Sequence, residues 1–279
     1  MTLGEHLREL RNRLAIALLA ILVLTIVAWF LYKPIFGFLT GPFCEMSGDA
    51  QVQPPPAGAI EDVGGTPGCP LYFTSIFQPF LIRLKVSALV AVVVSSPVWF
   101  YQIWGFVTPG LRRNERKWSL AFVLTAVPLF LLGAVLAYLV MSKGLALLLS
   151  FVPDEYGTLI GIDQYMTYTA AMIAIFGVAF ELPLLILLLN LAGVLTFARL
   201  KQWQRRAILL IFVFAAVATP SQDPFSMLAL GLSMTVLFEA SVLLAYLNDR
   251  RRGVGSVEAA YDELDDDQAS PLEMNRTDA

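Results

Sequence analysis

The amino-acid sequence predicts an all-α integral membrane protein: six transmembrane helices, several of them kinked by proline, form a concave bundle with a short hairpin of the fifth and sixth helices. Three observations support this fold class. Of the 279 residues, 57% are hydrophobic and only 15% are charged, and the mean hydropathy is +0.70. Such a composition lies outside the usual range of soluble domains. Apolar stretches long enough to span a bilayer recur along the chain, and basic residues gather between them.

The six predicted spans lie near residues 14–32, 86–107, 118–141, 165–191, 207–219 and 225–247. The first could instead be a signal peptide, because three arginines precede it. Its apolar run is longer than that of a signal peptide, however, and no clear small-residue cleavage site follows. The fifth span has only about 13 apolar residues, roughly 20 Å of helix. With the sixth it should form a short hairpin that thins the bilayer or draws in water.

Prolines lie inside three of the predicted helices, at Pro97, Pro128 and Pro183. Each removes a backbone hydrogen bond and tends to kink its helix. Neighbouring helices or water can satisfy the carbonyl that is freed. We therefore expect three bent helices that form a curved wall.

The distribution of basic residues predicts the orientation of the chain. Of the 19 lysines and arginines, 15 fall on the side that carries both termini. Cytoplasmic loops carry the excess of basic residues, so both termini are predicted to be cytoplasmic. Residues 1–13 should form an amphipathic surface helix, 14–247 the membrane domain, and 248–279 a disordered acidic cytoplasmic tail.

Residues 33–79 then form the longest extracytoplasmic loop, and this loop contains both cysteines of the chain, Cys44 and Cys69. In an oxidising compartment the two can form a disulfide, and the alternative is two unpaired thiols. A metal site is not expected, because no histidine is near.

Glu181 stands in the apolar segment "FGVAFELPLL". A carboxylate at the centre of a bilayer costs roughly 2.5 to 3.5 kcal/mol on insertion scales, so such residues usually face protein or a wet cavity. Ala170, Ala174 and Gly177 share its helical face, and small residues mark a close helix approach or a cavity. The alternative to a functional carboxylate is a protonated carboxyl group that hydrogen-bonds a neighbouring helix.

Five motifs together resemble the TatC family, the signal-recognition core subunit of the twin-arginine protein translocase. They are "HLRELRNRL", "YQIWGFVTPGLRRNERK", "FGVAFELP", "ATPSQDPFS" and "LFE", in this order across residues 5–247. The resemblance implies a non-enzymatic receptor in the cell membrane that binds twin-arginine signal peptides of folded proteins. It also implies TatA-like and TatB-like single-span partners, a homo-oligomer within a larger complex, contact with membrane lipid, and transport driven by the proton-motive force. Neither a cofactor nor nucleic acid is implied.

The same resemblance implies roles for individual residues. Glu9 and Glu115 would bind the signal peptide, supported by Arg11 and Phe106, and Glu181 would be a functional intramembrane carboxylate. Partner docking would involve Thr219, Asp223 and Glu239, and extracytoplasmic structural roles would fall to Pro42 and Asp163.

Some of these residues also have simpler explanations. Glu9 and Arg13 have the spacing of an ordinary helix-stabilising pair. Asp163 and Asp223 each precede a helix and could serve as caps. At the docking site, Met227 stands where some family members have glutamine, so the sequence departs from the family pattern there.

A proton-coupled transporter or channel with Glu181 as a relay is the alternative function, because intramembrane carboxylates also serve that role. Such transporters usually show inverted repeats, and no such pairing is evident between the two halves of the sequence. A membrane enzyme is a third class, but the sequence has no combination of a nucleophile and a base, and no phosphate-binding glycine loop.

Overall fold

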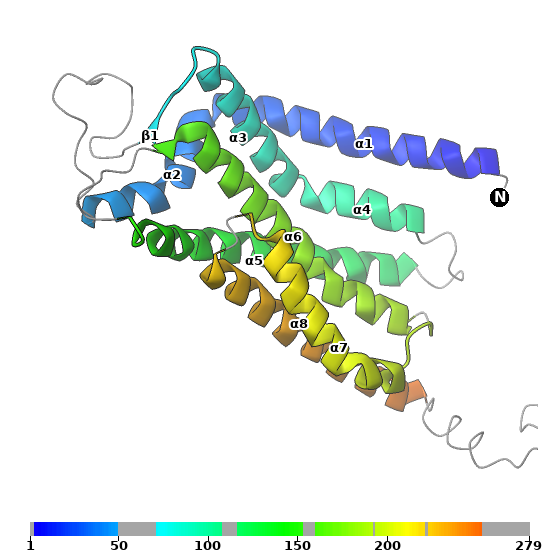
Figure 1. The fold of residues 1–279 in the computed structure, drawn as a ribbon. Coiled ribbons are helices and arrows are strands. Elements are labelled where there is room, and N and C mark those ends of the chain that lie inside the picture. The colour runs from blue at the N-terminus through cyan, green and yellow to red at the C-terminus, as the bar shows by residue number, and fades with distance from the viewer. Residues whose placement is uncertain are drawn as a thin grey trace, which may run out of the picture. The chain divides into compact units, whose positions relative to one another are not determined.

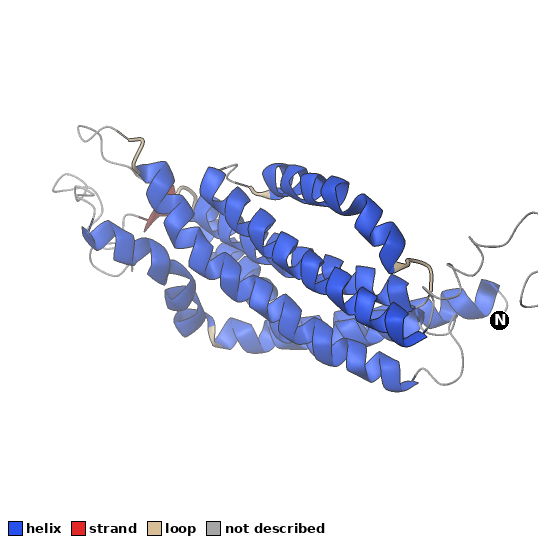
Figure 2. Cartoon of the chain, turned by 90° about the horizontal axis from the view of Figure 1, so that it is seen from below, coloured by secondary structure: helices blue, strands red, loops and turns tan. Residues whose placement is uncertain are grey.

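The computed structural model describes residues 3–49, 71–107, 116–152, 160–191, 193–220 and 223–252. Within these ranges helices account for nearly all of the chain, and two short strands are the only sheet (Figure 2). Figure 1 shows the order of the elements: α1 (Leu3–Phe30), α2 (Tyr32–Asp49), β1 (Leu71–Tyr72), α3 (Gln78–Val94), α4 (Ser96–Val107), α5 (Arg116–Leu149), β2 (Ile160–Gly161), α6 (Ile162–Leu191), α7 (Phe197–Ala218) and α8 (Pro224–Arg252). β1 and β2 pair in parallel.

Four of these helices are long and apolar enough to span a membrane, over residues 6–30, 122–149, 162–191 and 224–251. The bent pair α3 and α4 makes a fifth candidate if it is counted as one span. In the described part of the chain α7 does not qualify, because basic residues occupy its first half and only its second half is apolar. Each predicted span nevertheless falls on a helix or on the bent pair, so the all-α membrane fold is confirmed.

Two segments differ from the sequence-based boundaries. The predicted surface helix over residues 1–13 and the first span are one continuous helix, α1. The predicted loop over residues 33–79 begins with a helix, α2, which contains Pro42 and buries Leu39 and Phe43. Residues 50–70 of the loop and residues 253–279 of the predicted tail lie outside the described ranges.

The predicted kink at Pro97 is confirmed as a bend of 58° between α3 and α4. Ser95 lies between the two helices, and its N–H still donates to the Ala91 carbonyl at 2.8 Å. The carbonyl of Val92 accepts two side-chain donors there: the Trp99 indole N–H at 2.9 Å and the Ser95 hydroxyl at 3.2 Å. Pro128 and Pro183, by contrast, lie inside α5 and α6, which continue through them.

Helix α2 is held to the bundle by two tyrosine hydroxyls. Proline has no backbone N–H, so Pro42 cannot donate to the carbonyl of Phe38, four residues earlier. Tyr138 of α5 donates to that carbonyl at 2.8 Å, and its ring stacks on the Phe38 ring with centroids 4.5 Å apart. Tyr165 of α6 donates to the carbonyl of Leu39 at 2.7 Å. Side chains from two long helices thus bind the backbone of α2 around its proline.

Helices α5 and α6 approach closely where each has a glycine. A Cβ at Gly133 would lie 2.6 Å from the backbone oxygen of Phe176. A Cβ at Gly177 would lie 2.6 Å from the ring of Phe130. The prediction that the Gly177 face marks a close helix approach is confirmed, although Ala174 on the same predicted face is exposed.

The chain divides into two compact units, one of residues 1–181 and 212–233, the other of residues 182–211 and 234–279. The bend at Pro97, the tyrosine bonds to α2 and the glycine contact of α5 with α6 belong to the first unit. In the second unit the core comprises Leu200, Phe238, Val242 and Ala245.

Helix α6 ends at Leu191, and polar side chains of the second unit fix the connection to α7. Gly193 has a φ of +77°, which glycine adopts without strain, and its N–H donates to the Asn190 carbonyl at 2.9 Å. Asp249 of α8 accepts from the backbone N–H of Phe197 at 2.6 Å and from the Asn190 side chain at 2.9 Å. Asp249 therefore caps the first turn of α7 from another helix.

Replacing Tyr138 with phenylalanine tests the role of the proline in α2. Tyr138→Phe keeps the ring stack but leaves the Phe38 carbonyl without this donor. An unsatisfied acceptor away from water costs about 1 to 3 kcal/mol, so the free energy of unfolding should fall by that amount in denaturant titrations in detergent. Pro42→Ala restores a backbone N–H at position 42, so Tyr138→Phe should cost less in that background. Equal costs in the two backgrounds would show that Pro42 does not create the need for Tyr138.

The glycine contact between α5 and α6 predicts a difference between two Gly→Ala substitutions. Gly133→Ala places a methyl group against a backbone oxygen that cannot rotate away, and overpacking typically costs about 1 to 3 kcal/mol. Gly37→Ala is the matched control, because a Cβ there meets nothing within 4 Å. It should be neutral or stabilise α2 by up to about 1 kcal/mol through helix propensity. Similar losses for both variants in unfolding titrations would contradict the close approach.

Candidate functional site

Glu9 and Arg13 form an ion pair on α1. The Nε and Nη2 atoms of Arg13 both donate to Oε1 of Glu9, at 3.0 and 2.6 Å. Each side chain is 25% exposed, so the pair is neither fully solvated nor buried. The other oxygen of Glu9, Oε2, has no donor in the part of the chain that the structure describes. The helix-stabilising pair that the spacing predicts is thus formed, and its hydrogen bonds engage only Oε1 among the described residues.

The end of α4 lies against this ion pair, because α1 packs along α3 and α4 (Figure 1). Gly105 makes room for the arginine: a Cβ at this position would lie 2.0 Å from Nη1 of Arg13. The next residue, Phe106, stacks on His6 of α1 with ring centroids 4.4 Å apart. The structure thus brings Phe106 to the site of Glu9, as the resemblance implies. Sequence analysis missed Gly105, whose only signal is a glycine inside an apolar helix.

Two other residues expected at this site are not seen to contact Glu9. Arg11 is exposed, and its guanidinium donates to the Asn12 side chain at 3.3 Å. Glu115, the second predicted carboxylate, lies outside the described residues. A position for Glu115 beside Glu9 therefore stays a prediction.

Glu181 lies in α6 as a carboxyl group with both oxygens buried. Neither oxygen has a hydrogen-bond partner in the described ranges. The hydrogen bond to a neighbouring helix that the alternative expects is thus not formed among the described residues. Burial of an unpartnered polar group is costly, and in membrane helices such groups mark functional positions.

Asp163 stands in the first turn of α6 and binds across to α3. The ammonium group of Lys85 lies 2.6 Å from its Oδ1 and also donates to the hydroxyl of Thr167 at 2.9 Å. On the same stretch of α3, the guanidinium of Arg83 donates to the Trp29 carbonyl at 2.8 Å, at the end of α1. Asp163 thus joins α6 to α3 through an ion pair, and the extracytoplasmic structural role implied for it stays a prediction.

Asp223 is the N-cap of α8. Its Oδ1 accepts from the backbone N–H of Ser226 at 2.7 Å, and Pro224 occupies the first helical position. A Cβ at Gly144 of α5 would lie 2.8 Å from the Ser226 hydroxyl, so α5 and the start of α8 are in close contact. Thr219, at the end of α7, is buried, and its hydroxyl has no partner among the described residues.

The remaining predicted positions are Glu239, Pro42 and the two cysteines. Glu239 of α8 accepts from the Gln204 side chain of α7 at 2.7 and 2.8 Å, within the second unit. Pro42 is buried in α2. Cys44, two residues on, is in a disulfide bond, while Cys69 lies outside the described residues, so their pairing stays a prediction.

Comparisons with known proteins give one consistent result. A sequence model of the family described as Sec-independent protein translocase protein (TatC) matches residues 5–233. The "Sec-independent protein translocase protein TatC" of Frankia casuarinae is 49% identical over 99% of this chain and 74% of its own length. The protein of that name from Corynebacterium kroppenstedtii is 39% identical over 98% of this chain and 68% of its own. A solved structure titled "Crystal Structure of Twin Arginine Translocase Receptor- TatC in DDM" is 29% identical, with a TM-score of 0.69, and the match covers 86% of this chain and 99% of that one.

Proposed function

Because the chain belongs to the Sec-independent protein translocase (TatC) family, we propose that it is the signal-recognition core of a twin-arginine translocase. The resemblance that the motifs predicted is confirmed. In this role the chain binds twin-arginine signal peptides of folded proteins and organises TatA-like and TatB-like subunits in the cell membrane. Both termini are cytoplasmic, and the motive force is the proton gradient.

The observation that carries this proposal is the half-open carboxylate of Glu9. One oxygen holds the guanidinium of Arg13, and the other has no donor among the described residues. A guanidinium binds a carboxylate through two parallel N–H donors, a geometry that the single ammonium group of lysine cannot reproduce. The site is therefore chemically suited to arginine rather than to positive charge in general.

Arg13 competes with the signal peptide for the Glu9 carboxylate. A signal arginine that bonds both oxygens of Glu9 replaces Arg13 on Oε1, so the carboxylate keeps a cationic partner before and after binding. The partly buried carboxylate is therefore not left unpaired, which would be costly. Phe106 and His6 supply aromatic faces beside the carboxylate, on which a planar guanidinium can stack.

Paired arginines need a second acceptor, and Glu115 is the residue that we assign to it. It follows α4 in the sequence, and α4 already lies beside Glu9. Arg11 is exposed on the same helix as Glu9. We assign it a supporting role without direct contact with the carboxylate. Discrimination of a twin-arginine motif then rests on two carboxylates with fixed spacing.

The intramembrane and docking positions serve later steps in this proposal. Glu181 contacts a partner or the signal within the membrane after the first capture, and Thr219, Asp223 and Glu239 mark the region where a single-span subunit docks. The buried Thr219 hydroxyl, which has no partner in the described part of the chain, supports this, because a partner helix could satisfy it.

Glu9→Gln keeps the size of the side chain and removes its charge, so it isolates the carboxylate. Hydrogen bonds to charged groups are worth about 1.5 to 3 kcal/mol, and affinity for a twin-arginine peptide should fall roughly 10-fold to 150-fold. Glu115→Gln should act in the same way. Binding of a labelled peptide to the full chain in nanodiscs measures this, with a twin-lysine peptide as the reference ligand. Normal twin-arginine affinity in either variant would remove that carboxylate from the site.

Arg13→Gln is the informative control for Glu9→Gln. If Arg13 competes with the signal, its removal should raise the affinity for the twin-arginine peptide by up to about fivefold. The loss of one partly exposed ion pair is expected to change binding by this amount. A loss as large as that of Glu9→Gln would instead mean that Arg13 holds Glu9 in place for the signal.

Glu181→Ala should separate capture from transport. Peptide affinity should stay within about twofold of wild type, because Glu9 is on another helix near the chain terminus, whereas cargo export should fall strongly.

The Glu181 carboxyl group, which has no partner among the described residues, also fits a proton relay, the alternative function. A proton-coupled channel would move protons across proteoliposomes in the absence of cargo and lose this flux in Glu181→Gln. Such cargo-free flux would favour the channel over the receptor.

A further inference from the structure

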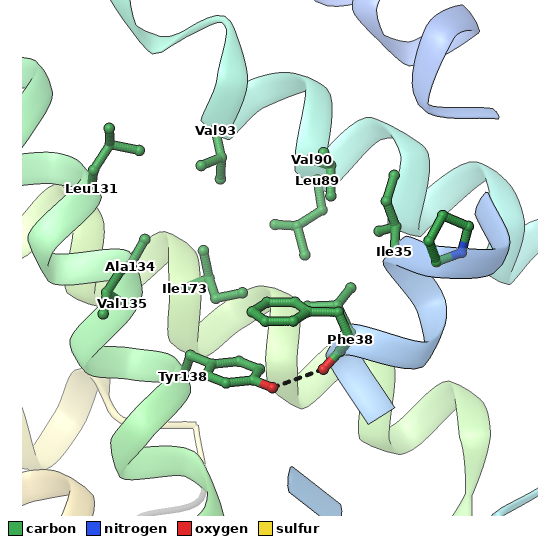
Figure 3. A pocket seen from close by; sticks show the side chains of 12 residues that line it. Ile35, Phe38, Leu89, Val90, Val93, Leu131, Ala134, Val135, Tyr138 and Ile173 are labelled. Carbon is green, nitrogen blue, oxygen red and sulfur yellow. Dashed lines mark hydrogen bonds between the residues drawn. The ribbon is translucent and has the colours of Figure 1, made fainter. Parts of the chain in front are cut away.

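The first unit contains an apolar cavity of about 490 Å³. Four helices form its walls (Figure 3). α2 contributes Pro34 and Phe38, α3 contributes Val93, α5 contributes Ala134 and Tyr138, and α6 contributes Ile173. The Tyr138 and Phe38 rings that stack on each other close one side of it.

The lining excludes polar ligands. Every side chain on the wall is apolar apart from Tyr138, and the hydroxyl of Tyr138 is already bonded to the Phe38 carbonyl. Apolar cavities of this kind stay dry, because water finds no partners in them, but they accept hydrocarbon ligands.

The position of the cavity indicates where a hydrocarbon would come from. Its walls on α3, α5 and α6 all lie inside candidate membrane spans. The surrounding solvent at that depth is the acyl chains of the bilayer. The cavity is about three times the size of an apolar cavity of about 150 Å³ that holds one benzene, so it has room for about eighteen carbon atoms. A long lipid acyl chain has about that many carbon atoms.

A lysine, Lys33, adjoins the cavity wall in the sequence. Lys33 is exposed, adjoins Pro34 of the cavity wall, and follows the candidate span that ends at Phe30 by three residues. Lys33 has no ion pair among the described residues, whereas Lys85, the nearby lysine of α3, is paired with Asp163. Lysine at the end of a span attracts anionic lipid headgroups.

We propose that this cavity binds one acyl chain of an anionic phospholipid whose phosphate lies at Lys33. The chain fills the space between α2 and the three long helices and supports the position of α2 at its Pro42 turn. This lipid site is separate from the signal site at Glu9 and does not depend on the proposed receptor function.

The acyl chain can be located by photocrosslinking. The full chain is reconstituted with phosphatidylglycerol that carries a diazirine within one acyl chain, irradiated, digested and analysed by mass spectrometry. Adducts should appear on Val93 and Ile173. Ala134→Phe fills the cavity and should remove most of these adducts, whereas Leu139→Phe should keep them, because Leu139 is exposed on the same helix outside the cavity. Unchanged adducts in Ala134→Phe would overturn the proposal.

Folding of the variants is checked by their melting temperatures in detergent. Should Ala134→Phe fail to fold, Val93→Phe fills the same space from α3, with adducts then scored on Ile173. Peptide binding at the Glu9 site is measured on the same samples and should be unchanged, so a failure of the lipid proposal is distinguishable from a failure of the receptor proposal.

The headgroup assignment has its own comparison. In the wild type, adduct yield should be about fivefold higher for phosphatidylglycerol than for phosphatidylcholine, as expected of about 1 kcal/mol for one lysine at the membrane surface. Lys33→Gln should abolish this preference. Lys143→Gln is the matched control, since Lys143 is an exposed lysine of α5 outside the cavity, and should leave the preference intact. Equal yields for the two lipids in the wild type would overturn the assignment to Lys33.

A protein segment is the other possible occupant. A benzophenone amino acid at position 135, a lining position whose side chain is 58% exposed, should crosslink to lipid in the reconstituted chain and remain on lipid when a twin-arginine peptide is added. Crosslinks that move from lipid to the peptide would assign the cavity to the signal and overturn the lipid proposal.

Discussion

The absence of water inside a bilayer is the constraint on which the rest of this structure depends. A backbone carbonyl that is freed by a proline or a helix end within the membrane needs a donor from the protein itself. Three side chains supply such donors: Tyr138 to Phe38, Trp99 to Val92 and Arg83 to Trp29. Because these carbonyls are satisfied, helices can bend or stop in places where hydrocarbon would otherwise oppose it.

One of these irregular points bears directly on the proposed signal site. The bend at Ser95 turns α4 away from the direction of α3, and α1 packs along both helices. The end of α4 therefore meets the first turns of α1, where Gly105 admits the Arg13 guanidinium and Phe106 stacks on His6. Glu9 is held half-bonded by Arg13 in this setting. The bend at Pro97 thus helps to place the end of α4 beside Glu9.

Local features of this fold could be predicted from sequence, and long-range ones could not. Apolar segment lengths predict the helices, the proline at position 97 predicts the bend, and four-residue spacing predicts the Glu9 and Arg13 pair, because all of these depend on neighbours in the chain. Helix α2 was missed because its proline and glycines oppose a helix locally, and its support comes from Tyr138, 100 residues away from Phe38. The contact of Arg13 with Gly105 could not be predicted from hydrophobic periodicity either, because the two residues are far apart in the sequence.

The central claim for function is that a signal arginine displaces Arg13 from Glu9. Nuclear magnetic resonance of the full chain in nanodiscs, with ¹⁵N in the side chain of Arg13, observes the Nε–H that now donates to Glu9 at 3.0 Å. A saturating twin-arginine peptide should move this resonance toward that of a solvated arginine, and a twin-lysine peptide should not. An Arg13 resonance that stays in place while the twin-arginine peptide is bound would contradict the claim.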